Sequence, residues 1–481
     1  MQKQNVNMVT RESLHQKIMR ISGLYFDQNN LITKILTTAV QRCSKDLPRD
    51  AIERLQPFYG IHASIVRIED CDFSSAINSI RVLTKEEKRS ASTTWILFGK
   101  LAHFDVSLKL TLLPTNLKAL LDENSLEIER LIYRKVINPL IMCGLTPHVV
   151  AYYGELFCEN FTDFLNGKIA QGDKPIIELA KELQKSIEVN PNSNPMPPPF
   201  NKPKTEKIPQ LNINKMRCLI TERVVGEQLG KGMRELQLKS SDLESVQKTI
   251  FVKFYLPILF QVFYTLAVFG EVGLVHNDLH TGNVFVEKYV KEVENCYLIN
   301  GKLYLLRTMY QSRIFDFDRG AKLPTVFDKT ELRNTLLSRQ HYCEEFGQCQ
   351  SVDERRELFT FCYYMYQQNN PRNIFLENLL QKIVPLELLI RLSSDQIKNK
   401  KDIAVGKTLA YFGRLCACKS KLCENCQLIN DRRILTPKQI IALPVFDRFL
   451  IDPSQVGSKF IWTLPSEANA DASERFKSAA Q

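Results

Sequence analysis

The feature that most constrains the fold is a pair of short acidic motifs in the second half of the chain. The first motif, H-x-D-L-H-x-G-N, runs from His276 to Asn283, and the second, D-F-D, begins at Asp316. The apolar run Val284–Val286 between them predicts a β-strand. In this pattern a carboxylate and an amide stand five residues apart, and a strand and a second carboxylate follow them. Ordinary buried loops, whose acidic side chains only bond the local backbone, rarely show this combination.

This spacing suits the transfer of a phosphoryl group. Such a reaction needs one carboxylate that orients the attacking hydroxyl and accepts its proton, and oxygen ligands that hold magnesium against the phosphates of ATP. Asp278 is the candidate base, and Asn283 and Asp316 are the candidate Mg²⁺ ligands. The motifs therefore predict an ATP- and Mg²⁺-dependent phosphotransferase.

Candidate residues for binding the nucleotide precede these motifs. Apolar and polar side chains alternate over residues 105–112, which predicts a strand with Lys109 on its polar face. A helix is predicted from Asn124 to Met142, because apolar residues recur there at three- and four-residue steps. Glu129 is the preferred ion-pair partner of Lys109, and Glu127 is the alternative.

With these residues in this order, the chain resembles the protein-kinase-like superfamily. In H-x-D-L-H and D-F-D it is most similar to the divergent serine/threonine kinases of large nucleocytoplasmic DNA viruses. The resemblance covers residues from about 85 to about 415 and implies an α+β, bilobal fold. A β-rich N-terminal lobe with one helix would precede a mainly helical C-terminal lobe, and Lys109 would contact the α- and β-phosphates of ATP.

The glycine-rich loop that covers the ATP phosphates in kinases is missing. A Ser- and Thr-rich segment precedes the strand that begins near Trp95, and its Ser90, Ser92 and Thr93 are the candidate phosphate-binding residues. Their hydroxyl and backbone N–H groups can approach phosphate, but they lack the conformational freedom of glycine. ATP affinity and the catalytic rate are the two properties that this departure from the family pattern would affect.

The hinge that binds the adenine edge in kinases is matched by Glu222 and Val224, which follow a predicted strand at Met216–Thr221. Thr221 stands at the gatekeeper position of the family. A Pro- and Asn-rich insertion at about 162–212 comes before this strand. Within it, a short helical segment is predicted around Ile176 to Ile187, and the Pro- and Asn-rich run from Asn190 to about Gln210 predicts an extended or disordered linker, because its composition cannot bury an apolar core.

The second half of the chain matches further parts of the family. A buried helix is predicted from about Val246 to Phe269, and Asn300-Gly301 between apolar runs predicts the turn of a hairpin over Tyr297–Met309. The run from Glu357 to Phe361 resembles the start of a second buried helix of the family, and Glu357 stands where the family usually has Asp. Asp318 replaces the glycine of D-F-G and could add a third carboxylate near the metal.

Two observations leave the class of acceptor open. His280 stands where serine/threonine kinases carry a lysine, and H-x-D-L-H-x-G-N is also the form found in small-molecule kinases of the aminoglycoside and choline type. No A-P-E follows Asp316. A serine/threonine protein kinase that acts on protein hydroxyls is the preferred function. A small-molecule kinase and a catalytically weak kinase-like scaffold are the alternatives.

The domain boundaries follow from these assignments. We expect an N-terminal extension at 1–84, a kinase-like N-lobe with the hinge at 85–225, a kinase-like C-lobe at 226–465 and a flexible tail at 466–481. The C-lobe contains a cysteine-rich segment, 416–426. Four thiolates at this spacing could form a structural zinc site, although unliganded thiols are the alternative; they are Cys416, Cys418, Cys423 and Cys426.

The bulk composition indicates a soluble globular protein. The most apolar stretch, Phe251–Val275, contains charged residues, so no membrane span is predicted. The N-terminus has no apolar segment, so no secretory signal is predicted. Thirteen scattered cysteines suit a reducing compartment, and we expect a cytoplasmic protein, in the host cytoplasm or the virion if it is viral. The net charge of +11 is spread along the chain. Because the charge is not clustered, no specific nucleic-acid binding is expected. The partners that the family resemblance implies are ATP and protein substrates.

Overall fold

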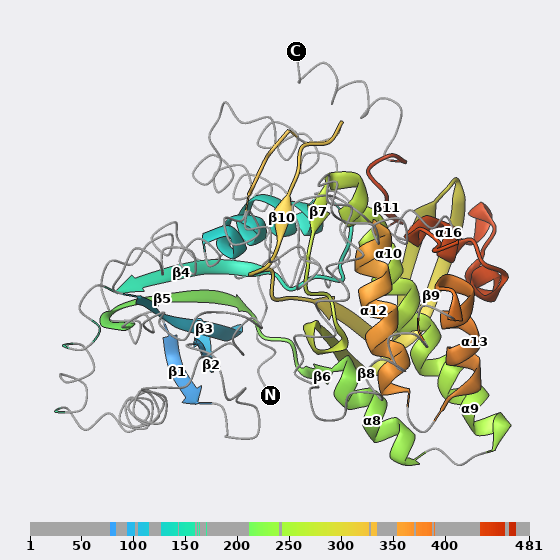
Figure 1. Ribbon diagram of the computed structural model, residues 1–481, viewed down its shortest axis with the longest axis horizontal. Coiled ribbons are helices and arrows are strands. Elements are labelled where there is room, and N and C mark those ends of the chain that lie inside the picture. The colour runs from blue at the N-terminus through green and yellow to red at the C-terminus, as the bar shows by residue number, and fades with distance from the viewer. Residues whose placement is uncertain are drawn as a thin grey trace, which may run out of the picture.

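The computed structural model describes about half of the chain in an α+β architecture. The described residues are 77–82, 94–101, 104–114, 127–142, 144–158, 211–239, 243–326, 329–333, 354–369, 372–386, 433–456 and 461–467, together with 161, 163, 170 and 389. Figure 1 shows a β-sheet on the left of the molecule and most of the helices on the right.

The sheet has the order β1-β2-β3-β5-β4, and all its neighbouring strands are antiparallel. Its strands are β1 (Ile77–Val82), β2 (Thr94–Leu101), β3 (Phe104–Pro114), β4 (Tyr152–Cys158) and β5 (Leu211–Glu222). The first strand lies within the range 1–84 that the sequence assigned to an extension. The sheet therefore includes the end of that range.

Strand β3 confirms the predicted alternation of side chains. Val106, Leu108 and Leu110 are buried in the core, whereas Ser107 and Lys109 on the other face are only half-buried. Such alternation results from the period of two of an extended chain, in which successive side chains point to opposite faces. Lys109 lies in the middle of the sheet, opposite Ile96 of β2 and Leu219 of β5.

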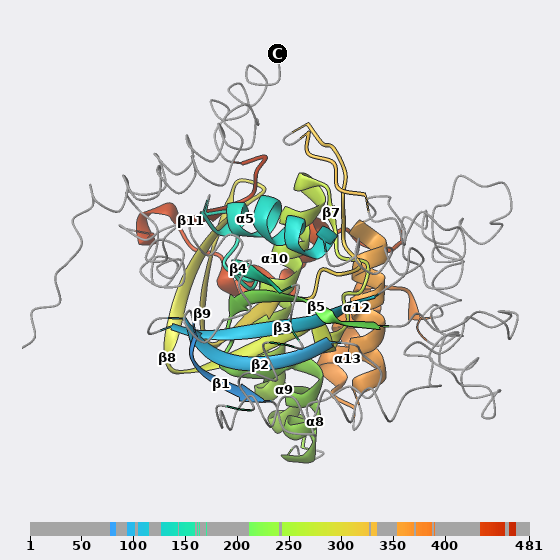
Figure 2. The ribbon, with the colours of Figure 1, turned by 90° about the vertical axis from the view of Figure 1, so that its left-hand side faces the viewer.

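A helix over residues 127–142 packs beside the sheet, as predicted. Its first part is α-helical, its middle is the π-helical turn η4 (Tyr133–Ile137), and it ends with α5 (Asn138–Met142). Figure 2 shows α5 lying near β4. Side chains from the predicted apolar stripe, among them Ile132 and Val136, are buried.

The helical part is built around one long run, Glu244–Val272, which confirms the predicted buried helix. It comprises α9 (Glu244–Ile250), η5 (Phe251–Tyr255) and α10 (Leu256–Val272). Gly273 ends the run with a positive φ of 76°, a conformation that glycine adopts without strain. By length and composition the run could cross a membrane, but 83% of its most apolar window is buried inside the protein.

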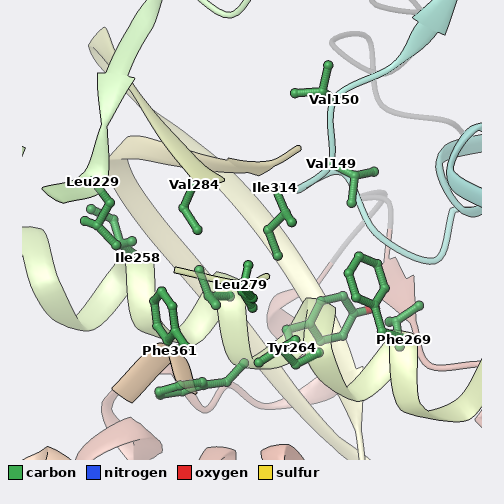
Figure 3. Packing of buried hydrophobic residues seen from close by; sticks show 14 of the residues in the cluster. Val149, Val150, Leu229, Ile258, Tyr264, Phe269, Leu279, Val284, Ile314 and Phe361 are labelled. Carbon is green, nitrogen blue, oxygen red and sulfur yellow. The ribbon is translucent and has the colours of Figure 1, made fainter. Parts of the chain in front are cut away.

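Shorter helices surround α10. These are α8 (Leu229–Lys239), α12 (Glu354–Gln368), α13 (Ile374–Ile383), α16 (Pro437–Ile441), η9 (Pro444–Phe449) and η10 (Pro453–Gln455). Figure 3 shows Leu279 in the same apolar cluster as Ile258 and Tyr264 of α10 and Phe361 of α12. This packing anchors the 276–283 loop, which is the segment His276–Asn283, to the core of the helical part.

One long hairpin follows the 276–283 loop. It joins β8 (Val284–Ile299) to β9 (Lys302–Ile314), with a register shift between Lys288 and Val293. The turn at Asn300-Gly301 is confirmed, and both residues have positive φ, 52° and 69°. The separate short strand and later hairpin that the sequence predicted are thus parts of a single hairpin.

Four shorter strands and the side chain of Gln261 hold this hairpin and the 276–283 loop in place. Strands β6 (Gly226–Gln228) and β11 (Ile461–Thr463) pair with β8, and β7 (Leu274–Val275) pairs with β10 (Ala321–Lys322). Gln261 is a buried polar residue of α10, and its side-chain amide forms hydrogen bonds with the backbone of β9 at 2.6 and 2.9 Å. The helix and the hairpin are therefore joined at a defined register.

The cysteines are not all in one state. Cys158 is disulfide-bonded, whereas Cys218, Cys296 and Cys362 are free and buried. The disulfide differs from the expectation of a chain with reduced thiols throughout. The cytoplasmic localisation stays a prediction.

Candidate active site

The 276–283 loop is held by the start of α12. The carboxylate of Glu357 accepts hydrogen bonds from the backbone N–H groups of His276, at 2.9 Å, and Asn277, at 2.6 Å. Asn277 has a positive φ of 63°, which asparagine tolerates better than most residues. Two N–H donors on one carboxylate fix the entry of the loop, so the position predicted for Glu357 has a clear structural role.

Asp278 lies near the start of this loop and Asn283 ends it, and a hydrogen bond from side chain to backbone joins the two residues. The side-chain amide Nδ2 of Asn283 donates to the backbone carbonyl of Asp278 at 2.8 Å. The other amide atom, Oδ1, is buried and has no hydrogen-bond partner among the residues that the structure describes. A buried acceptor without a donor is costly, and a bound cation would satisfy it.

Lys109 joins the sheet to the rest of the site. Its ammonium lies 2.8 Å from Oε2 of Glu129 and 2.7 Å from Oδ1 of Asp316. Burial lowers the pKa of Lys109, but Asp316 and Glu129 outweigh this effect and raise the pKa well above its ordinary value. The lysine is therefore a permanent positive charge between two carboxylates.

The two candidate glutamates on the helix differ in their partners. Glu129 is buried and binds Lys109. Burial raises the pKa of Glu129, and the charge of Lys109 opposes that rise. Glu127 instead forms ion pairs with Arg130 and Arg217, the latter at 3.0 Å. Residues two apart on a helix point in different directions, so only one of the two faces Lys109.

Asp316 begins the D-F-D motif in a conformation that is unusual for a non-glycine residue. Its φ is 70°, and its backbone N–H donates a hydrogen bond to the hydroxyl of Tyr133 at 3.2 Å. The next residue, Phe317, packs edge-on against Tyr133, with ring centroids 5.2 Å apart, and against His276 at 4.8 Å. These contacts place the Asp316 carboxylate beside Lys109.

The environment of Asp278 favours a protonated carboxyl group. Burial raises its pKa to about 7, Arg319 acts in the opposite direction, and the charge of Asp318 adds to the rise. Burial also raises the pKa of Asp318, with Asp316 as the next cause. A carboxylate with a pKa near neutrality suits proton transfer at neutral pH.

His280 is part of the loop geometry. Its Nδ1 accepts a hydrogen bond from the backbone N–H of Gly282 at 2.9 Å, so the neutral ring carries its proton on Nε2. That nitrogen lies 3.9 Å from Oδ2 of Asp278. The ring also lies near Tyr364 of α12, with centroids 5.5 Å apart. His280 therefore faces Asp278.

Of the predicted hinge residues, Glu222 ends β5 and Val224 follows it. The side chain of Glu222 accepts a hydrogen bond from the backbone of Ala151 at 3.0 Å. Val224 is half-buried and the next residue, Val225, is exposed. Thr221 pairs with Ser107 of β3 in the sheet. The segment therefore connects the sheet to β6.

Several candidate residues lie outside the described part of the chain. They are Ser90, Ser92 and Thr93 of the proposed phosphate segment and Cys416, Cys418, Cys423 and Cys426 of the possible zinc site. Most of the 162–212 insertion and residues 468–481 of the predicted 466–481 tail are outside it as well, whereas Ser466 is described and its backbone N–H donates to Glu271 at 2.7 Å. These assignments stay predictions.

Asn283 and Asp316 present the kind of oxygen atoms that Mg²⁺ prefers. Within the described ranges, no group of three or more His, Cys, Asp or Glu side chains could hold a metal ion by itself. Mg²⁺ at nucleotide sites is usually bound by one or two protein ligands together with phosphates and water. The buried, unpaired Oδ1 of Asn283 and the carboxylate of Asp316 fit this pattern.

Two contacts in the site were not predicted from the sequence. One is the hydrogen bond that the backbone N–H of Asp316 donates to the hydroxyl of Tyr133. The other is the side chain of Asn277, which donates to the carbonyl of Arg319 at 3.0 Å and accepts from Arg356 at 2.7 Å. The position of Tyr133, four residues after Glu129 on one helix face, was the available signal for the first.

Comparisons with known proteins do not assign the chain to a family. No protein-family model matches the chain, and no curated protein matches its sequence. One similar solved structure is the crystal structure of a kinase domain, with 13% sequence identity over 78% of this chain and 91% of that chain, and a TM-score of 0.31. Neither value is high enough to establish a shared fold or activity. The kinase-like fold and the resemblance to viral kinases therefore stay predictions.

Proposed function

We propose that the protein is an ATP- and Mg²⁺-dependent phosphotransferase with a two-lobed, kinase-like fold, and that it phosphorylates serine and threonine hydroxyls on proteins. One observation carries the proposal. Lys109 of the sheet lies within 2.8 Å of both Glu129 and Asp316, which come from two other parts of the chain. This arrangement supports a site in which a fixed ammonium group meets the phosphates of a nucleotide.

Asp278 would act as the general base. The acceptor hydroxyl attacks the γ-phosphorus of ATP, its proton passes to the Asp278 carboxylate, and the bond from that phosphorus to the β–γ bridging oxygen breaks to release ADP. Lys109 would hold the α- and β-phosphates, and Glu129 would keep Lys109 in place. The pKa of Asp278, about 7, leaves a large fraction of the carboxyl group ionised at neutral pH.

Asn283 and Asp316 would bind the metal ion. Mg²⁺, when bound, neutralises negative charge on the phosphates. On the protein side, Oδ1 of Asn283 is buried without a hydrogen-bond donor among the described residues. Its Nδ2 is held by the backbone of Asp278 at 2.8 Å, which orients Oδ1 and ties the metal ligand to the base.

A small-molecule acceptor is the second candidate, and His280 is the observation that favours it. With Nδ1 occupied by Gly282, the neutral ring offers one N–H donor near Asp278 rather than the fixed charge of a lysine. A site with less positive charge around the transferring phosphate suits acceptors that themselves carry a positive charge, such as aminoglycosides or choline. The protein acceptor remains our first choice.

The proposal is tested by following the γ-phosphate of ATP with Mg²⁺. The acceptors are a basic Ser- and Thr-containing protein, an aminoglycoside and choline, and products are identified by mass spectrometry. We compare wild type with Asp278→Asn and with Asp447→Asn, a control at an exposed position on η9. Transfer to protein that is lost in Asp278→Asn only would support the proposal.

Other outcomes of this assay are equally informative. Transfer to the small molecules alone would support the second candidate. Equal transfer by wild type and Asp278→Asn would contradict the role of Asp278 as base. The absence of any transfer and of ATP binding would leave a kinase-derived scaffold as the better account.

A further inference from the structure

The helix at 127–142 makes a second contact with the site through Tyr133, four residues after Glu129. The ring of Tyr133 is buried, with 3% of its surface exposed, and its hydroxyl accepts a hydrogen bond from the N–H of Asp316 at 3.2 Å. We propose that Tyr133 is a positioning residue whose hydroxyl holds Asp316 in the orientation that binds Mg²⁺ and ATP. The inference rests on the proposed function and concerns the same site.

Such a contact matters at Asp316 because its backbone lies outside the common conformations. A φ of 70° lies in the left-handed region, which is uncommon for any residue except glycine, although aspartate enters it more often than most residues do. The peptide N–H of Asp316 moves with this φ, so a hydrogen bond to that N–H opposes rotation out of the observed conformation. The carboxylate then stays 2.7 Å from Lys109.

The position of the Tyr133 hydroxyl is itself well determined. The ring stacks on Tyr152 of β4, with centroids 5.9 Å apart and planes at 16°, and it meets Phe317 edge-on at 87°. Phe317 in turn packs against His276. Burial raises the pKa of Tyr133 well above its ordinary value, so the phenol stays protonated. A fixed ring gives a fixed hydroxyl.

The contact also couples the helix to the metal ligand. Glu129 and Tyr133 lie on one face of the helix because they are four residues apart, and they bind Lys109 and Asp316, which bind each other. A shift or rotation of the helix would break both contacts at once. The helix position therefore controls the lysine and the metal ligand together.

The decisive variant is Tyr133→Phe, which removes one oxygen atom and keeps the ring contacts. We expect the Mg²⁺ concentration for half-maximal transfer to rise about five- to tenfold, the effect of losing one buried hydrogen bond. We expect kcat to fall as well, whereas KM for the acceptor should stay unchanged. A residue that only supports the core would not shift the Mg²⁺ dependence.

Tyr264→Phe is the matched control. Tyr264 is fully buried in α10, and its hydroxyl donates to the backbone carbonyl of Leu145 at 2.7 Å, away from Lys109 and Asp316 among the residues that the structure describes. The control loses one buried hydroxyl and one hydrogen bond to the backbone, as Tyr133→Phe does. We expect similar small losses of thermal stability in both variants, and an altered Mg²⁺ dependence in Tyr133→Phe alone.

The outcomes separate this inference from the proposed function. If wild type transfers phosphate and Tyr133→Phe has an unchanged Mg²⁺ dependence, the inference is overturned and the proposed function stands. If wild type transfers no phosphate, the proposed function fails, and thermal stabilisation by ATP with and without Mg²⁺ becomes the test. A smaller Mg²⁺-dependent stabilisation in Tyr133→Phe would then support the inference, and equal or absent stabilisation would overturn it.

Discussion

Asp278 is subject to two opposing requirements. A general base must be ionised, yet its carboxyl group lies in a loop where burial and the charge of Asp318 favour the protonated form. The positive charge of Arg319 reduces this effect without cancelling it. The result, a pKa of about 7, places the change of ionisation in the physiological range.

This pKa predicts how the transfer rate depends on pH. The carboxyl group must lose its proton to act as base, so kcat should rise with pH through about 7 and level off near pH 8. At pH 6 we expect a rate about tenfold below the plateau, one pH unit below the pKa. The measurement is kcat from pH 5.5 to 8.5 at saturating ATP, Mg²⁺ and acceptor. A rate that is constant or falls between pH 6 and 8 would contradict the assignment of Asp278.

Lys109 provides a second test at the scale of single residues. Lys109→Met keeps much of the side-chain length but removes the charge between Glu129 and Asp316. We expect the transfer rate to fall at least about 100-fold, the effect of losing one fixed electrostatic contact to the reacting group. Lys231→Met on α8, where the lysine is exposed, serves as the control. Full activity of Lys109→Met would exclude a role for Lys109 in binding phosphate.

The choice between Glu127 and Glu129 shows how far residue-scale prediction can go. Both glutamates occur near the start of one helix, and the sequence could only rank them. The decision depends on how the helix is rotated about its axis, which is set by packing partners such as Arg217, far away in the chain. The hydroxyl contact of Tyr133 with Asp316 spans 183 residues, and its sequence signal was the four-residue spacing of Tyr133 from Glu129.

At the scale of elements, α12 supports the reactive loop. Glu357 is buried, and its carboxylate receives two backbone N–H groups of the 276–283 loop. Arg356 beside it binds the side chain of Asn277. The start of one helix therefore holds the loop that carries Asp278 and Asn283.

Glu357→Gln should weaken this support. A glutamine offers one acceptor oxygen and places an NH₂ group against the second N–H, so one backbone donor is left unpaired. We expect the free energy of unfolding to fall by about 2 kcal/mol, and kcat to fall because Asp278 is less well oriented. Chemical denaturation and the transfer assay measure the two effects. Glu244→Gln, an exposed position in the first turn of α9, is the control, and equal stability of both variants would contradict this role.

The β8–β9 hairpin shows where element-scale prediction stops. The turn at Asn300-Gly301 was predictable because two successive residues with positive φ strongly favour Asn-Gly. The length of the strands was not predictable. Residues 287–292 are mostly polar and exposed, so they lack the apolar alternation that reveals a half-buried strand. The long helix of Glu244–Val272 was predictable because its apolar character is continuous.

At the scale of the whole molecule, the sheet and the helical part meet at the site. Lys109 and Tyr133 come from the sheet side, and Asp316 follows the hairpin of the helical side. A backbone bridge between Val149 and Ile314 adds a third contact. A nucleotide bound beside Lys109 and Asp316 would contact both sides at once, which is consistent with the two-lobed arrangement that we propose.

The C-terminal strand is expected to stabilise the whole fold without taking part in the reaction. Strand β11 pairs in parallel with β8, and its Trp462 is buried and donates a hydrogen bond to Asn295 at 3.3 Å. Trp462→Ala should lower the free energy of unfolding by about 3–5 kcal/mol. Val290→Ala, at a side chain that is 94% exposed, should change it little.

Thermal unfolding measures this effect, and kcat is measured well below the melting temperature of the variant. We expect kcat to stay near the wild-type value, since β11 has no contact with Lys109, Asp278 or Asp316 among the described residues. A large loss of kcat in a folded Trp462→Ala protein would show that the C-terminal strand acts on the site.

The most direct test of the central claim is a crystal structure of the protein with Mg²⁺ and a non-hydrolysable ATP analogue. We predict that Lys109 contacts the α- and β-phosphates, that Asn283 and Asp316 bind the metal ion, and that the γ-phosphate faces Asp278. A nucleotide bound elsewhere, or a site without nucleotide at saturating concentration, would contradict the account.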